Sequence, residues 1–343
     1  MKDIEKLLRP NIASLCPYST ARDDFKGDLG IFVDANVNPY DNGWNRYPDP
    51  HQAKVKEALS AIKGVPVENL FLGNGSDEAI DLVFRVFCRP GVDNAVAIEP
   101  SYGMYSVSAA TNDVALRSAS LIPETFALDE EKIASLCDPC TKVLFLCSPN
   151  NPSGNAFDRE QILRIADNFP GVVVVDEAYV DFSSKGSLLQ DAVRRSDMIV
   201  LQTLSKAWGM ASLRLGMAVS CQRTISLMSR VKYPYNISLP VQKLVLESLD
   251  KAKHDSQVKE ILQQRRRLEK SLRGLGIVRK VYDSDANFLL VKFDDADSVY
   301  EALVQKGVIV RNRDRVPLCK GCLRITVGTP EENDRLVQIL SEL

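Results

Sequence analysis

One lysine of the chain occupies a position that favours chemistry over a surface role. Lys206 lies in the segment TLSKAWGMASLRLGMAVS, residues 203–220, among small and apolar residues, and Arg214 follows eight positions later. An amine in a poorly hydrated pocket, near other positive charge, is neutral often enough to form an imine with an aldehyde. The alternative interpretation is that Lys206 is an ordinary solvated charge.

An acid and a glycine turn could complete such a site. Asp176 directly follows the run VVVV, residues 172–175. It could cap a helix or form a structural ion pair, or it could hold a positively charged ring nitrogen. The turn GNGS, residues 73–76, precedes a helical pattern, and free N–H groups at a helix N-terminus bind phosphate. Many glycine turns are only turns, and this one matches neither GxGxxG nor a P-loop, which argues against nucleotide binding.

The order of the predicted elements indicates an α/β fold. From about residue 53 to 220, short apolar runs alternate with amphipathic patterns such as DEAIDLVFRVF, where Ile80, Val83, Phe84 and Phe87 share one face. Runs such as VVVV are apolar on both faces, as in buried parallel strands flanked by helices. We therefore predict a large, mainly parallel-sheet α/β/α domain over residues 36–235.

The pattern changes in the last third of the chain. Helical stretches there lead into predicted strands NFLLVKF, GVIVRN and CLRITV. A final helix begins with Thr329 and Glu332 as a capping box and Pro330 at its first position. We predict a smaller α+β domain over residues 236–343, with residues 1–35 forming an N-terminal arm packed against it.

Polar or aromatic groups follow five predicted strands of the larger domain. In an open parallel sheet, ligands bind beyond the carboxyl ends of the strands, so these groups should meet at one edge. The groups are the turn 73–77, Tyr102, Asn151, the trio Asp176, Glu177 and Tyr179, and the trio Thr203, Ser205 and Lys206.

Composition excludes several other classes of protein. The 343 residues carry a formal net charge of -2, which gives no basic footprint for nucleic acid. The N-terminus lacks the apolar run of a signal peptide, and no stretch is long enough to span a membrane, so we expect a cytoplasmic protein without a membrane partner.

The eight cysteines include two C-x-x-C pairs, Cys137/Cys140 and Cys319/Cys322, which could hold zinc. The pairs lie about 180 residues apart, far beyond the usual spacing, and the chain has only two histidines. We therefore interpret the cysteines as reduced structural thiols and expect no metal.

A pyridoxal phosphate site requires a lysine, an acid opposite the ring nitrogen, a phosphate pocket and a group covering the ring. With these candidates in sheet order, the segments DANVNPY, GNGSDEAIDL, SPNNPSG, VVVDEAYVDF and TLSKAWGMASLRLG resemble the fold-type I pyridoxal-phosphate-dependent aminotransferase family over nearly the whole chain. The segments RYPD and LRITVGT, with the arginines upstream, resemble its histidinol-phosphate aminotransferase branch.

The resemblance implies a role for each cofactor-binding residue. Lys206 would form a Schiff base with pyridoxal 5'-phosphate, and Asp176 would partner the pyridine nitrogen. Asn151 and Tyr179 would bind the phenolic oxygen, and Tyr102 would stack on the ring. The cofactor phosphate would be held by the amides of Ser76 and Asp77, by Thr203, Ser205 and Arg214, and by Tyr47 of a second subunit in a homodimer.

The same resemblance implies a substrate site formed by Tyr18, Asn36, Arg311 and Arg324, with both arginines binding a phosphate. Val37 departs from the family, since it replaces the carboxylate of the usual NENP segment. The implied reaction converts L-histidinol phosphate and 2-oxoglutarate to imidazole-acetol phosphate and L-glutamate, in histidine biosynthesis. Alternatives are an aromatic amino-acid transaminase, a phosphothreonine decarboxylase, or a non-catalytic pyridoxal-binding regulator. Such a regulator would normally carry a DNA-binding domain, for which the chain has no room.

Overall fold

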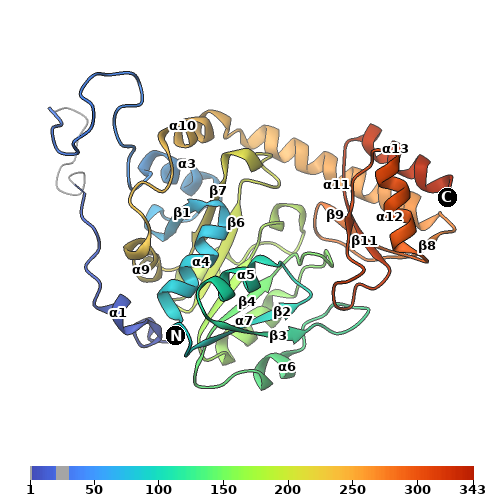
Figure 1. Cartoon of the computed structure of the whole chain (residues 1–343), viewed down its shortest axis with the longest axis horizontal. Coiled ribbons are helices and arrows are strands. Elements are labelled where there is room, and N and C mark those ends of the chain that lie inside the picture. Colours follow the sequence, from blue (N-terminus) through green and yellow to red (C-terminus); the bar gives the residue numbers. More distant parts are fainter. Residues whose placement is uncertain (1, 21–30) are drawn as a thin grey trace.

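The structure is a computed structural model that describes residues 2–20 and 31–343. Its described residues form two β-sheets with helices packed around them, and the two sheets lie at opposite sides of the molecule (Figure 1).

The larger sheet has seven strands in the order β1-β7-β6-β5-β4-β2-β3. Strand β7 runs antiparallel to β1 and β6, whereas the pairs among β2 to β6 are parallel. The strands are β1 (Leu70–Asn74), β2 (Asn94–Glu99), β3 (Ala115–Ser120), β4 (Thr141–Cys147), β5 (Val172–Asp176), β6 (Met198–Thr203) and β7 (Leu215–Val219). Strand β5 is central, and its valines are buried on both faces, as the run VVVV predicts.

Helices cover both faces of this sheet, so the predicted α/β/α architecture is confirmed. The helices are α3 (Ala53–Lys63), α4 (Gly75–Phe87), α5 (Met104–Thr111), α6 (Glu130–Ser135), α7 (Arg159–Asn168), α8 (Leu189–Arg194), α9 (Gln222–Val231) and α10 (Leu239–Ser248), with 3-10 turns η2 (Val67–Asn69), η3 (Val180–Phe182) and η4 (Ala211–Leu213). Two apolar cores result, one on each face. The predicted apolar stripe of α4 is buried in one of them.

The smaller sheet is antiparallel, in the order β10-β11-β9-β8. Its strands are β8 (Val278–Val281), β9 (Phe288–Phe293), β10 (Arg311–Asn312) and β11 (Cys322–Thr326), and its helices are α11 (Lys251–Arg273), α12 (Ala296–Gln305) and α13 (Pro330–Ser341). The predicted capping box of Thr329 and Glu332 begins α13. The predicted strand GVIVRN is wrong in length, because only its last two residues pair with β11.

The packing changes from one sheet to the other later than predicted. Helix α10 packs on α3, and its Val245 belongs to a core of the larger sheet. Helix α11 then spans the distance between the two sheets (Figure 1), and its C-terminal Leu268 and Leu272 enter the core of the smaller sheet. The division therefore falls along α11 and not at residue 236.

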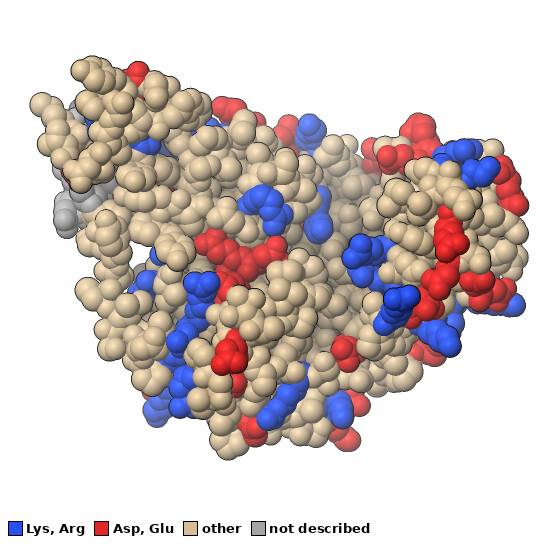
Figure 2. Space-filling model, viewed as in Figure 1, with Lys and Arg blue, Asp and Glu red and all other residues tan. Residues whose placement is uncertain are grey.

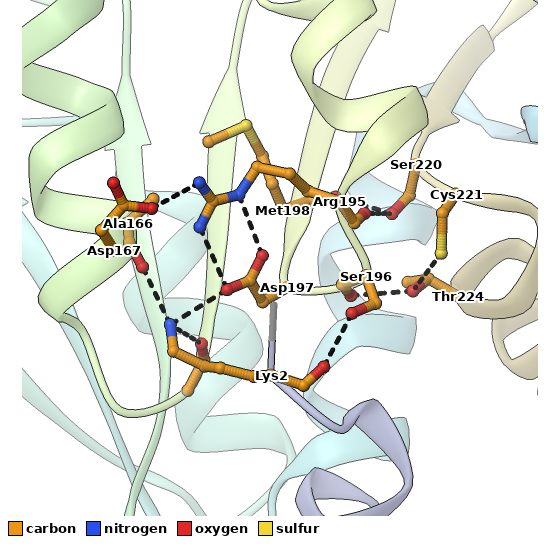
Figure 3. A network of polar contacts seen from close by, with 11 residues as sticks. Lys2, Ala166, Asp167, Arg195, Ser196, Asp197, Met198, Ser220, Cys221 and Thr224 are labelled. Atoms are coloured by element: carbon orange, nitrogen blue, oxygen red, sulfur yellow. Dashed lines mark hydrogen bonds and ion pairs between the residues drawn. The ribbon is translucent and has the colours of Figure 1, made fainter.

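The N-terminal segment, with η1 (Ile4–Leu7) and α1 (Pro10–Ala13), packs on the larger sheet's domain. Lys2 donates to the carbonyls of Ala166 (2.8 Å) and Gly171 (3.3 Å) and pairs with buried Asp197 at 3.1 Å (Figure 3). The prediction that this arm packs with the smaller domain is wrong for residues 2–13, because Ile4, Leu8 and Ile12 are buried beside α4.

Candidate active site

One pocket lies at the carboxyl edge of the larger sheet and encloses about 490 Å³, part of it open to solvent. The parallel strands end there, and antiparallel β7 begins there, which places Arg214 at the same edge. The predicted residues that line the pocket are Ser76, Asp77, Tyr102, Asn151, Asp176, Tyr179, Thr203, Ser205, Lys206 and Arg214. Gly75 of the predicted glycine turn also lines the pocket, and Cys147 and Ala178, which sequence patterns did not identify, complete the lining.

The N-terminus of α4 forms one end of the pocket. No side chain caps this helix, so the first-turn N–H groups of Ser76 and Asp77 are available to a ligand. Gly75 has φ +69°, and a Cβ there would lie 2.7 Å from Nη2 of Arg214. A Cβ on Gly216 would lie 2.2 Å from the amide nitrogen of Ser76. Both glycines therefore allow β7 to approach the helix terminus closely.

Hydroxyl and guanidinium groups surround these amides. The Thr203 hydroxyl lies 3.0 Å from that of Ser205 and accepts from the Ser205 N–H at 3.1 Å. Arg214 pairs with Asp77 at 3.1 Å. Free amides, hydroxyls and a guanidinium at a helix N-terminus form a site suited to a phosphate group.

Asp176 lies at the base of the pocket and is 2% exposed. One carboxylate oxygen accepts from the Tyr105 hydroxyl at 2.8 Å, and the other accepts from the Ala178 N–H at 3.1 Å. Burial raises the pKa of Asp176 to about 6, although both hydrogen bonds oppose the shift. The group is therefore an anion above neutral pH, able to hold a positive charge. Tyr105 is buried in α5, and its spacing in the sequence indicates only a helix core.

Lys206 lines the same pocket as Asp176, and its Nζ lies 5.5 Å from the ring centroid of Tyr179. Partial burial lowers the pKa of Lys206, and the charges of Arg324 and Arg214 lower it further, whereas Asp176 and Asp77 raise it. Although nearby protein atoms remove part of its hydration, Lys206 remains solvent-exposed, unlike the poorly hydrated lysine that we expected, because this pocket opens to solvent. The nearby positive charge is nevertheless present.

Tyr102, Asn151 and Tyr179 contribute three further side chains to the pocket lining. Tyr102 donates to Asp77 at 3.0 Å and contacts Tyr105 edge-on. The Asn151 side-chain oxygen accepts from Nη1 of Arg324, which leaves its NH2 group to donate into the pocket. Tyr179 is buried edge-on against Phe288 of β9, at 5.1 Å between ring centroids.

The two predicted substrate arginines come together through the smaller sheet. Arg311 of β10 is paired directly with Arg324 of β11, so both side chains lie on the same face. The Arg324 guanidinium lies 5.3 Å from the ring centroid of Phe288 and reaches Asn151 of the pocket. This contact joins the smaller sheet to the pocket of Lys206.

Tyr18, Asn36 and Tyr47 do not line this pocket. Tyr18 is 75% exposed and lies in a separate hollow near Lys232. Asn36 is exposed, and Tyr47 stacks on Tyr235 at 4.4 Å in a hollow that also includes Val37.

Residues 2–20 and 31–343 contain no cluster of three or more metal-ligating side chains. All eight cysteines are free thiols, including both C-x-x-C pairs. No described helix is both long and apolar enough to cross a bilayer.

Comparison with known proteins assigns the fold and site to a class. The chain belongs to the aminotransferase class I and II family, whose model matches residues 35–340. Relatives that are 43–53% identical to this chain are named histidinol-phosphate aminotransferases; the one from Parabacteroides distasonis is 53% identical over 344 residues, covering 100% of this chain and 99% of the relative. The resemblance predicted from sequence is therefore confirmed.

Solved structures share the fold. The histidinol-phosphate aminotransferase from Clostridium acetobutylicum superposes with a TM-score of 0.78 at 20% identity, over 87% of this chain and 90% of that one. The enzyme from Sinorhizobium meliloti, solved in complex with pyridoxal-5'-phosphate, gives 0.77 at 22% identity, over 87% and 82% of the two chains.

The buried Asp176 predicts a specific dependence of stability on pH. Its pKa is 3.8 in a model peptide and about 6 in the fold. The native state therefore binds more protons than the unfolded chain between about pH 4 and 6, and Asp176 makes stability fall as pH rises through that window. Asp176→Asn removes this titration. The free energy of unfolding of the cofactor-free variant, relative to wild type, should increase by roughly 2–2.5 kcal/mol from pH 4 to pH 7.

Denaturant titrations at a series of pH values measure this difference. Burial raises the pKa of Glu177 to about 7. Because Glu177 is present in both proteins, its contribution to the pH dependence of stability cancels in the difference between their free energies of unfolding. A difference in stability that stays constant from pH 4 to pH 7 would show that Asp176 has an ordinary pKa.

Proposed function

We propose that this protein is a pyridoxal-phosphate-dependent transaminase that converts L-histidinol phosphate and 2-oxoglutarate to imidazole-acetol phosphate and L-glutamate in histidine biosynthesis. The observation that carries the proposal is the position of Lys206, which shares one pocket with Asp176 and the α4 N-terminus. The relatives support the choice of substrate, since those between 43% and 53% identical are named histidinol-phosphate aminotransferases.

The pocket fits pyridoxal phosphate through the chemistry of its walls. The amides of Ser76 and Asp77, with Thr203, Ser205 and Arg214, would bind the phosphate, and the two glycines let β7 and Arg214 lie close to these amides. Asp176 would pair with the ring nitrogen, and Tyr102 would cover one ring face. Asn151 and Tyr179 would bind the phenolic oxygen. When bound, the cofactor supplies an aldehyde for the substrate amine and a ring that accepts the electron pair of the reacting carbon.

Different residues of the chain would carry out proton transfer and substrate binding. Nζ of Lys206 would take the proton from the substrate carbon that bears the amine, and its lowered pKa favours the neutral form that this requires. Arg311 and Arg324 would bind the substrate phosphate, because two guanidinium forks match a dianion. We also propose that the enzyme works in the cytoplasm, where amino-acid biosynthesis takes place.

Lys206→Ala should retain the fold and lose turnover, because no other amine lines the pocket formed by the described residues. Borohydride treatment of the holoenzyme should fix a pyridoxyl group on Lys206, which peptide mass spectrometry detects. Lys185→Ala, which removes another exposed lysine of the same domain, is the matched control and should stay active. Labelling of a different lysine would overturn the assignment.

Arg324→Ala should lower kcat/KM for histidinol phosphate by about 30-fold or more, since truncating one partner of a buried charge pair costs roughly 2–5 kcal/mol. The visible absorption of the bound cofactor should remain. Unphosphorylated histidinol should be a poor substrate of the parent enzyme. Its kcat/KM should fall much less in Arg324→Ala than the kcat/KM of histidinol phosphate. Equal losses for both substrates would contradict binding of the phosphate by Arg324.

The same assay separates the alternative activities. An aromatic amino-acid transaminase would prefer aromatic amino acids to histidinol phosphate, and a phosphothreonine decarboxylase would release carbon dioxide from phosphothreonine. A non-catalytic regulator would bind the cofactor and turn over none of them.

We further propose a homodimer in which Tyr47 of each subunit completes the cofactor phosphate site of the other. The support is the exposure of apolar side chains in residues 31–48, where Ile31 and Val33 are 93% and 86% exposed. Exposed apolar side chains grouped on one segment mark an interaction surface. A second subunit, related by two-fold symmetry, would cover this segment.

Tyr47→Phe removes the hydroxyl that would reach the phosphate, so the dimer should release pyridoxal phosphate more readily on dialysis. Analytical ultracentrifugation should show a dimer for both proteins. A fully active monomer in sedimentation, or unchanged cofactor retention in the variant, would refute the shared site.

A further inference from the structure

A third arginine, Arg313, stands on the same face of the smaller sheet as Arg311 and Arg324. The pairing of β10 with β11 continues past Asn312, because the Arg313 N–H donates to the Cys322 carbonyl at 2.9 Å. Side chains alternate between the two faces of a strand, so residues 311 and 313 point the same way.

The opposite strand identifies that face. Leu323 and Ile325 of β11 are buried in the core under α12 and α13. Cys322 instead belongs to a core of the larger sheet, and Arg324 reaches Asn151. The three arginines therefore lie on the face of the smaller sheet turned toward the pocket. Figure 2 shows basic side chains on the smaller domain beside the recess that separates it from the larger one.

These guanidinium groups have no acidic partner within residues 2–20 and 31–343, where the salt bridges involve other arginines. Arg313 and Arg324 are partly buried, and Nε of each is buried without a hydrogen-bond partner. Burial lowers the pKa of Arg313 to about 10, and Arg324 and Arg311 add to the shift. Like charges placed together across a sheet destabilise the fold, so the arrangement is explained by an anion that binds there.

We propose that Arg313 is a third phosphate-binding arginine that makes this subsite selective for a phosphate dianion over a carboxylate. The inference rests on the proposed function and goes beyond the Arg311–Arg324 pair. Histidinol phosphate ends in a dianion, whereas the distal group of 2-oxoglutarate is a monoanionic carboxylate. Two guanidinium groups suffice for the carboxylate, and the third neutralises the additional charge of the phosphate.

The test compares Arg313→Gln with Arg315→Gln in the holoenzyme, where the cofactor fills the α4 phosphate site. Arg315 is exposed in the next turn, so its replacement removes the same charge without touching the arginine face. Arg313→Gln should raise KM for histidinol phosphate about tenfold or more, and KM for 2-oxoglutarate less than about threefold, as expected for one charge-assisted contact. Arg313→Lys should restore part of the affinity, and Arg315→Gln should resemble wild type.

Inorganic phosphate provides a readout that does not depend on turnover. It should raise the melting temperature of wild-type and Arg315→Gln holoenzyme more than that of Arg313→Gln. Without phosphate, the melting temperature of Arg313→Gln should equal or exceed that of wild type, because the substitution removes a positive charge that no acidic group compensates. Lower melting temperatures with and without phosphate, together with equal KM increases for both substrates, would mean a structural role and overturn the inference.

The two proposals fail in different ways. If histidinol phosphate is turned over but Arg313→Gln behaves as Arg315→Gln in both experiments, the role of Arg313 is refuted alone. If histidinol phosphate is not turned over, the proposed function fails, and the phosphate-dependent melting still decides whether Arg313 binds the anion.

Discussion

The parallel register of β4, β5 and β6 is the constraint on which the site depends. It aligns Cys147 with Asp176 and Asp176 with Leu201, so the loops that follow these strands begin at the same edge of the sheet. Asp176 is thereby fixed by the backbone of a central strand, and Lys206 follows within a few residues of the end of β6. The apolar runs that bury these strands on both faces also determine where the chemistry lies.

The parts of the pocket and its surroundings differ in the sign of their charge. Asp176 is a buried anion at the base, supported by Tyr105 and the Ala178 N–H. Positive charge lies at two other places, at Arg214 beside the α4 N-terminus and at the arginine face of the smaller sheet. Both places act on Lys206, since Arg324 and Arg214 lower its pKa in addition to the effect of burial. A ligand with an anionic group at each end and a cationic ring in the middle complements this distribution of charge.

Sequence patterns predicted the features that depend on local order along the chain. The fold class and the apolar face of α4 follow from periodicity, and the pocket residues follow from the rule that ligands bind at strand ends. Tyr105 could not be predicted, because its spacing marks a buried helix position and only the tertiary structure brings its hydroxyl to Asp176. Arg313 was missed because its face depends on the register of a two-residue strand. Tyr18, Asn36 and Tyr47 lie away from the pocket because no contact within one chain brings them to it.

The most direct test of the central claim is a crystal structure of the protein with pyridoxal phosphate and histidinol phosphate. We predict the cofactor ring stacked on Tyr102, with its nitrogen beside the Asp176 carboxylate and its aldehyde carbon beside Nζ of Lys206. The substrate phosphate should lie within hydrogen-bonding distance of Arg311 and Arg324. Density for the ring at another lysine, or for the substrate phosphate away from the smaller sheet, would contradict the account.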